Sequence, residues 1–72
     1  MAQKFGNVIR RRREAASLSQ EALAAEAGLH RTYISLLERG LRTPTIEVVR
    51  QLAEALDTTM AGLMGEVEGT GK

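Results

Sequence analysis

The sequence predicts a small all-α protein of five helices, and three features support that fold class. Apolar residues recur at helical spacing, and no segment shows the strict alternation of a β-strand. Most of these residues are Leu and Ala, and Phe5 and Tyr33 are the only Phe, Tyr or Trp residues, a composition that favours closely packed helices. A chain of 72 residues has room for one core. We therefore expect one domain over residues 1–65 and a flexible tail over residues 66–72.

The first helix is expected over residues 4–16. Phe5, Val8, Ile9 and Ala16 fall on one side of it, which we expect to be buried. Arg12 falls on the same side, where its aliphatic stem can cover apolar surface while its guanidinium group reaches water.

The second helix is expected to begin after Ser19, because a serine hydroxyl there can accept a free N–H group of the first turn. Leu23, Ala24 and Ala27 form its predicted buried side. Gly28 is expected to end the helix, since a left-handed residue is favoured at that position.

The third helix is expected over residues 31–39, with Gly40 at its end. Ile34 and Leu37 lie on one side of it, which His30 and Leu41 extend, and this side is expected to face the core. Short polar and basic residues point the opposite way: Thr32, Ser35 and Arg39, flanked by Arg31 and Leu36.

The fourth helix is expected to begin after Thr45, which Pro44 precedes. Its predicted apolar stripe consists of Ile46, Val49, Leu52, Ala53 and Leu56. A last short helix carries Met60, Leu63 and Met64 and is expected to end near Gly65.

Positive charge is concentrated in the first part of the chain. Residues 1–42 carry eight basic and four acidic side chains, whereas residues 43–72 carry two basic and five acidic ones. One end of the folded molecule could therefore face a polyanion while the other does not. A solvated helix face around Arg10–Arg13 would produce the same pattern.

Residues 20–39 predict two helices joined by a tight glycine turn. Ala24 is small where the second of these helices would press against the first, and Gly28 lies in the turn. Ile34 and Leu37 would hold the second helix against the body. Such a unit lets the outer face of its second helix enter the major groove of DNA, which is about 12 Å wide. An ordinary helical hairpin could show the same spacing.

Enzyme chemistry has little support in the sequence. Cysteine is absent, which excludes disulfides, thiolate metal sites and cysteine nucleophiles. His30 is the only histidine, and neither metal-ligand spacing nor a phosphate-binding glycine loop accompanies it. We expect no enzyme, metal or cofactor. No apolar run approaches the roughly 18 residues that span a bilayer, and no secretion signal is evident, so a cytoplasmic protein without a membrane segment is expected.

The segment from Leu18 to Leu56 resembles the Cro/C1-type helix-turn-helix family of phage repressors and related bacterial regulators. Several short motifs carry the resemblance in order: Ser19-Gln20, Leu23-Ala24, Ala27-Gly28-Leu29, Ile34, Leu37-Glu38-Arg39-Gly40 and Pro44. The resemblance extends from Phe5 to about Met64. It implies a five-helix, lambda-repressor-like domain that binds double-stranded DNA.

The resemblance assigns base-reading roles to Arg31, Thr32 and Ser35. Arginine can contact guanine with two hydrogen bonds, and threonine can offer a hydroxyl or a methyl group to a base. Because these positions vary freely within the family, the operator sequence is not predicted. Tyr33 borders the buried side of the third helix, so both core packing and a DNA contact stay open for it.

The resemblance also implies contacts with the DNA backbone. Gln20, at the start of the second helix, is similar to the family residue that hydrogen-bonds a phosphate. Arg39 and Arg42 resemble phosphate clamps, although either could be a solvated charge. Arg13 and Glu38 match a pair that forms a partly buried salt bridge in relatives, and this bridge would also present Arg13 near the DNA backbone. Arg12 departs from the family, which usually carries an apolar residue there.

Within this family, the short length and the stretch His30-Arg31-Thr32-Tyr33-Ile34-Ser35 resemble the controller proteins of restriction–modification systems. That resemblance implies a dimeric transcriptional regulator with no separate ligand domain and no evident small-molecule effector. Two alternatives stay open: an antitoxin-type protein-binding module, and the DNA-binding part of a longer regulator.

A homodimer on a palindromic or pseudo-palindromic operator is expected, because one helix-turn-helix unit reads only a few base pairs. Met60, Leu63 and Met64 supply more apolar side chain than one short helix needs for inward packing, and methionine suits an adaptable contact surface. We therefore expect these three residues at the dimer interface. The alternative is that they close the core of the monomer.

Overall fold

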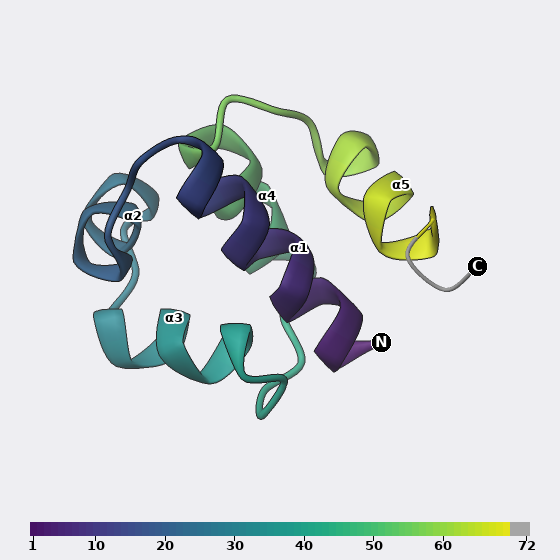
Figure 1. Cartoon of the computed structure of the whole chain (residues 1–72), viewed down its shortest axis with the longest axis horizontal. Helices are drawn as coiled ribbons and strands as arrows, with labels where there is room; N and C mark the ends of the chain where they lie inside the picture. The colour runs from purple at the N-terminus through teal and green to yellow at the C-terminus, as the bar shows by residue number, and fades with distance from the viewer. Residues whose placement is uncertain (70–72) are drawn as a thin grey trace.

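The computed structural model describes residues 1–69, and these residues form five α-helices without a β-strand among them (Figure 1). The helices are α1 (Ala2–Ala15), α2 (Gln20–Ala27), α3 (Arg31–Glu38), α4 (Ile46–Ala55) and α5 (Met60–Gly69). The predicted all-α fold class is confirmed. Over residues 1–69 none of the helices has both the length and the apolar character that crossing a bilayer requires.

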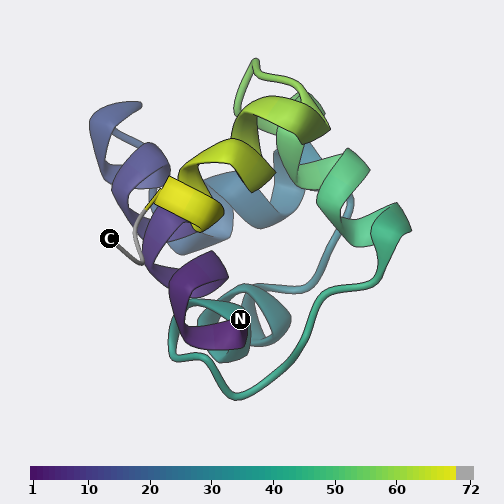
Figure 2. The same cartoon turned by 90° about the vertical axis from the view of Figure 1, so that its right-hand side faces the viewer.

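The core draws side chains from every helix. α1 packs against α3 and α5, α2 packs against α3 and α4, and α4 packs against α5 (Figures 1 and 2). The largest fully buried side chains are Phe5, Val8, Ile9, Leu23, Ile34, Leu37, Leu52 and Leu63. α3 therefore rests on α1 and α2, while α5 packs on α1 and α4.

The first helix begins earlier than predicted, since α1 runs from Ala2 to Ala15, and Ala16 is exposed.

Local sequence signals set both ends of α2 and the start of α4 as predicted. The Ser19 hydroxyl accepts a hydrogen bond from the Ala22 N–H at 2.9 Å, and the Thr45 hydroxyl accepts one from the Val48 N–H at 3.2 Å. Gly28 ends α2 with a φ of 72°, a left-handed conformation that glycine adopts without steric cost. These caps determine where the turn between α2 and α3 begins.

The predicted apolar stripe of α4 is wrong at its first residue. Ile46 is 78% exposed, and the inward positions of the first turn are occupied by Val48 and Val49. The expected extension of the α3 core side to His30 and Leu41 is also wrong, because His30 is exposed and Leu41 is 60% exposed. Leu41 lies within the connection between α3 and α4, and Ile46 begins α4 directly after it, where the chain runs over the surface.

The last helix is longer than the sequence predicted. Residues 66–69, expected to belong to the tail, continue α5 as far as Gly69. Val67 is buried, and the Arg12 Nε donates a hydrogen bond to the Glu66 Oε2 at 2.6 Å. These two contacts tie the end of α5 to the body, and the ion pair gives Arg12 a partner. The rest of the predicted tail, residues 70–72, lies outside the described residues.

Candidate DNA-binding surface

As predicted, α2 and α3 are two helices joined by a tight turn that contains Gly28. The small residues Ala24 and Ala27 are buried on α2, which packs directly against α3. The Leu29 N–H bonds the Ala24 carbonyl oxygen at 2.9 Å, and the Leu29 side chain packs against the core. The fully buried side chains of Ile34 and Leu37 hold α3 in place, so one side of α3 is packed on the core and the other is exposed.

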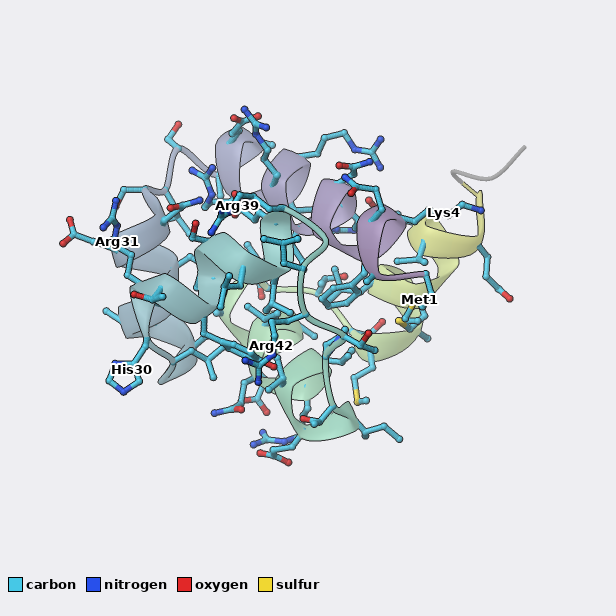
Figure 3. The ribbon with its side chains drawn as sticks, turned by 90° about the horizontal axis from the view of Figure 1, so that it is seen from below. Met1, Lys4, His30, Arg31, Arg39 and Arg42 are labelled. Atoms are coloured by element: carbon cyan, nitrogen blue, oxygen red, sulfur yellow. The ribbon has the colours of Figure 1, made fainter. Side chains whose placement is uncertain are left out.

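The open side of α3 carries the predicted base-reading residues. Arg31 and Thr32 are exposed in the first turn of the helix, and Ser35 is half-buried one turn later. Within residues 1–69, the side chains of Arg31 and Thr32 form neither an ion pair nor a hydrogen bond, so their polar groups are available to a ligand. Figure 3 views the molecule from this side, with Arg31 near the start of α3.

Arg39 and Arg42 lie on either side of α3 in Figure 3. Both are exposed. The Arg42 guanidinium carbon lies over the Tyr33 ring, 5.5 Å from its centroid. The Tyr33 ring is partly buried and packs against the core, so the predicted core packing of Tyr33 is present, and its contact with DNA stays a prediction.

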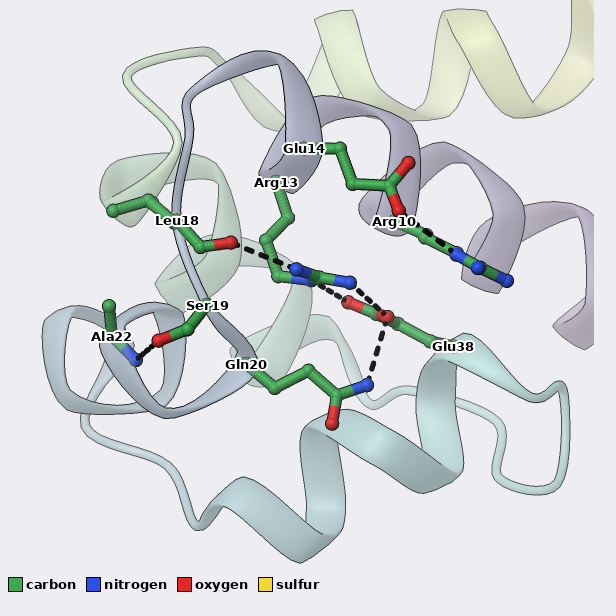
Figure 4. A network of polar contacts seen from close by, with 8 residues as sticks. All are labelled: Arg10, Arg13, Glu14, Leu18, Ser19, Gln20, Ala22 and Glu38. Carbon is green, nitrogen blue, oxygen red and sulfur yellow. Dashed lines mark hydrogen bonds and ion pairs between the residues drawn. The ribbon is translucent and has the colours of Figure 1, made fainter.

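The expected pair of Arg13 and Glu38 joins α1 to the end of α3 (Figure 4). The Arg13 Nε lies 2.7 Å from the Glu38 Oε2, and the Arg13 Nη2 donates to the other carboxylate oxygen at 3.1 Å. A further bond runs from the Arg13 Nη1 to the Leu18 carbonyl oxygen at 2.8 Å. The hydrogen bond that Arg13 donates to Glu38 raises the pKa of Arg13 above its ordinary value. Such two-pronged pairing fixes both side chains.

Gln20 joins the same network, which the sequence did not predict. Its Nε2 donates a hydrogen bond to the Glu38 Oε1 at 3.1 Å (Figure 4). A side-chain amide nitrogen carries two protons, so one remains for the predicted phosphate contact. The network therefore connects the start of α2, the end of α1 and the end of α3. The Gln20 amide donor and the Glu38 carboxylate acceptor come together only when α2 and α3 pack against each other.

Charge is distributed unequally over the exposed faces. On α4, Arg50 is paired with both Glu47 and Glu54, and the hydrogen bond from Arg50 holds the pKa of Glu47 below its usual value. One guanidinium group there faces two carboxylates, so that face carries no excess of positive charge. Around α3, in contrast, Arg31, Arg39 and Arg42 have no carboxylate partner within the described part of the chain. These unpaired guanidinium groups give the face of α3 an excess of positive charge that can attract a polyanion.

The three residues predicted at a dimer interface differ in burial. Leu63 is fully buried in the core of its own monomer, so the prediction that its side chain meets a second copy is wrong. Met60 and Met64 are partly buried against the same core and keep part of their surface exposed. Of the three predicted residues, Met60 and Met64 remain candidates for the interface.

His30 precedes α3 as its N-cap and is exposed. It makes no side-chain capping bond, and within residues 1–69 it has no neighbouring pair of His, Cys, Asp or Glu residues that could complete a metal site. The exposed surface around α3 is thus lined by Arg31, Thr32, Arg39 and Arg42 and, within the described residues, holds no cluster of metal-binding side chains.

Known proteins with a helix-turn-helix unit are similar to this chain in sequence. The helix-turn-helix family designated HTH_3 matches residues 9–63. The control protein C.MunI of a Mycoplasma species is 35% identical over 66 residues, which cover 90% of this chain and 89% of that protein. An HTH-type transcriptional regulator of Mycobacterium tuberculosis is 45% identical over 51 residues, or 71% of this chain, and the chain spans only 36% of the length of that regulator.

Among solved structures, the restriction–modification controller protein C.AhdI from Aeromonas hydrophila is similar throughout. It aligns with a TM-score of 0.84 and 42% sequence identity over 86% of this chain and 94% of that protein. The chain therefore resembles these helix-turn-helix proteins in both sequence and fold.

Proposed function

The chain belongs to the helix-turn-helix family HTH_3, and from that premise we propose that it binds a specific site in double-stranded DNA and thereby regulates transcription. The exposed face of α3 is the observation that carries the proposal. Arg31 and Thr32 project from a helix that is held down on its other side, and their donors have no partner within residues 1–69. Together with Ser35 they contact base edges in the major groove.

The backbone contacts surround these base-reading residues. Arg39 and Arg42 flank α3, as the two phosphate backbones flank the major groove. Gln20 and the free N–H groups at the start of α2 bind a further phosphate. Arg13 holds the Glu38 carboxylate that also bonds Gln20, and the same pairing presents Arg13 near the DNA backbone. These contacts fix the register of the protein on the duplex, whereas Arg31, Thr32 and Ser35 supply the sequence preference.

The protein acts as a homodimer on a palindromic or pseudo-palindromic operator in this proposal. One small module buries roughly 600–1,000 Å² on DNA, which supports limited specificity, so two copies are required. Two-fold symmetry then places the two α3 helices about one turn of DNA apart, roughly 34 Å. α5 packs on α1 and α4, away from α3, and its partly exposed Met60 and Met64 are the proposed contact.

The similarity to C.MunI and C.AhdI supports a more specific role as a restriction–modification controller. Both similarities extend over nearly the full length of those proteins, which therefore match this chain in size as well as in sequence. We propose no catalytic activity, cofactor or small-molecule effector. Binding to chromosomal or plasmid DNA would place the protein in the cytoplasm.

A second candidate is the DNA-binding part of a longer regulator. The chain spans about a third of the length of the M. tuberculosis regulator that it matches, so the same domain occurs there with additional sequence. An antitoxin-type module that binds another protein is a weaker candidate. It requires a surface for a protein partner, whereas the exposed polar residues of α3 fit a duplex.

Selection of bound sites from a random pool of duplex DNA tests the proposed function. Enrichment of one palindrome, with half-sites separated by about one helical turn, is expected. Uniform recovery of all sequences at physiological salt would contradict specific binding. Enrichment of single half-sites would contradict the dimer while leaving DNA binding intact.

A further inference from the structure

Arg42 is the basic residue of the α3 face whose side chain has a defined neighbour. Its guanidinium carbon lies 5.5 Å from the centroid of the Tyr33 ring, within the roughly 6 Å over which a cation is attracted to an aromatic face. Within residues 1–69, Arg42 forms neither an ion pair nor a side-chain hydrogen bond. The ring is therefore the contact that holds this side chain in the free protein.

The ring offers a fixed platform. Tyr33 lies between the outward and inward sides of α3, and its ring is partly buried against the core. A tyrosine side chain has only two rotatable angles, and packing against the core restricts both. A guanidinium group resting on such a ring loses freedom before any ligand arrives.

The backbone after α3 brings Arg42 to the ring. Gly40 adopts a left-handed conformation with a φ of 73°. The Gly40 N–H bonds the Leu37 carbonyl oxygen at 3.0 Å, and the Leu41 N–H bonds the Leu36 carbonyl oxygen at 2.9 Å. This pair of bonds is the Schellman motif, which reverses the chain at the end of a helix. Arg42 follows directly, so its side chain returns alongside α3 and reaches Tyr33.

We propose that Tyr33 is a positioning residue for Arg42: its ring holds the Arg42 guanidinium beside α3, oriented toward one phosphate backbone of the bound DNA. The proposal rests on the proposed function. An unrestrained arginine loses side-chain entropy when it binds a phosphate, whereas an arginine already held on a ring loses less. Tyr33 thereby strengthens binding to every DNA sequence alike, because a phosphate contact carries no sequence information.

Arg39 supplies the matched control. It lies on the other side of α3 from Arg42 in Figure 3 and is not stacked on Tyr33. A change at Tyr33 should therefore alter the contribution of Arg42 and leave that of Arg39 unchanged. This difference separates positioning from a general loosening of α3, which would weaken both arginines.

The test measures affinity for the selected operator and for random duplex DNA over a series of salt concentrations. Tyr33→Phe keeps the ring and should bind like the wild type. Tyr33→Leu should lose about two- to fivefold on both DNAs, the range expected for an exposed cation–π contact. It should keep the wild-type salt slope, because Arg42 still reaches its phosphate. Arg42→Ala should reduce the slope by about 0.9, the value for one phosphate.

Double variants decide whether the two residues act together. Tyr33→Leu should cost nothing further in the Arg42→Ala background and should keep its full effect in the Arg39→Ala background. Equal losses in both backgrounds would overturn the proposal. So would a loss in Tyr33→Phe that equals the loss in Tyr33→Leu, since it would assign the role to the hydroxyl. Arg42→Lys, which keeps the charge without the planar group, should reproduce the loss of Tyr33→Leu without altering the core.

The stack is also measurable without DNA. Aromatic ring currents should shift the NMR signals of the Arg42 side chain upfield in the wild type and in Tyr33→Phe, and the shift should disappear in Tyr33→Leu. Unshifted Arg42 signals in a wild type that binds its operator would overturn the positioning role and leave the proposed function intact. A wild type that binds no DNA would remove the proposed function and the positioning role together, even with the shift present.

Discussion

Gly6 of α1 lies directly against the backbone of α3, where a β-carbon at Gly6 would overlap the carbonyl oxygen of Leu37. The Glu38 carbonyl oxygen would be 2.9 Å from the same β-carbon. No residue with a β-carbon fits at this position without moving one helix, because the obstructing atoms are backbone rather than flexible side chain. This close approach sets the distance between α1 and α3.

Gly6→Ala should therefore destabilise the fold. Overpacking of this kind usually costs about 1–3 kcal/mol, and for a domain of this size each kcal/mol lowers the midpoint of thermal unfolding by about 4–8 °C. Circular dichroism during heating measures the shift. Gly65→Ala is the control, since nothing lies within 4 Å of a β-carbon there and alanine is the better helix former. A thermal midpoint for Gly6→Ala at or above the wild-type value would show that the two helices can separate freely.

Glu38→Gln should destabilise the protein more than the loss of an exposed ion pair does. The Glu38 side chain is 4% exposed and receives hydrogen bonds from Arg13 and Gln20. Removal of its charge leaves the Arg13 guanidinium, whose pKa is raised by Glu38, charged and without a counterion. Breaking a buried pair costs about 3–5 kcal/mol, and less where water reaches the remaining charge. Chemical denaturation gives the free energy of unfolding directly.

The control for Glu38→Gln is Glu14→Gln. Glu14 pairs with Arg10 on the outer side of α1, where both side chains are more than half exposed. Surface pairs of this kind contribute about 0–1 kcal/mol. Similar free energies of unfolding for the two variants would mean that the Arg13–Glu38 pair does not hold α1 to α3.

Arg31→Ala and Arg42→Ala should weaken DNA binding in different ways. Loss of a bidentate contact at Arg31 should cost about 1–3 kcal/mol on the operator and relax the preference at one base position. Loss of Arg42 should weaken operator and random DNA alike. Titrations against operators mutated one position at a time separate the two patterns. An equal loss on operator and random DNA for Arg31→Ala would contradict its base-reading role.

The sequence was sufficient for features that depend on near neighbours. The caps at Ser19 and Thr45 and the left-handed Gly28 depend on the few residues around them, and all three are present. The pair of Arg13 and Glu38 was expected only through family resemblance, since 25 residues separate the two. Local periodicity alone could not have placed them together.

The features that the sequence did not predict depend on packing between distant segments. The backbone contact of Gly6 is invisible until α1 and α3 meet. The extension of α5 beyond Gly65 depends on Val67 and on the pairing of Glu66 with Arg12 across the fold. Glycine ends a helix only where a left-handed turn is required, and a glycine inside a helix with nothing near it, as at Gly65, is tolerated at modest cost.

The dimer surface has two candidates that differ in position. Met60 and Met64 are partly exposed on α5, which packs on α1 and α4 and leaves α3 free. Ile46 and Leu41 are more exposed, but they border the end of α3 and the start of α4. Contact through α5 keeps the second copy clear of the groove that α3 enters. Contact through Ile46 would place the second copy at the start of α4, directly after the connection that carries Arg42.

We expect Met60→Asp and Met64→Asp to convert a dimer into a monomer, and Ile46→Asp to leave the dimer intact. A buried charge without a partner is strongly unfavourable, so one carboxylate at the centre of a two-fold contact appears twice and opposes association. Sedimentation at micromolar concentration measures the oligomeric state, and circular dichroism confirms that each variant is folded. A monomeric wild type at that concentration would contradict the α5 dimer. Dissociation by Ile46→Asp alone would instead place the interface at the connection between α3 and α4. The spacing of the two half-sites on the operator would then be set by that interface.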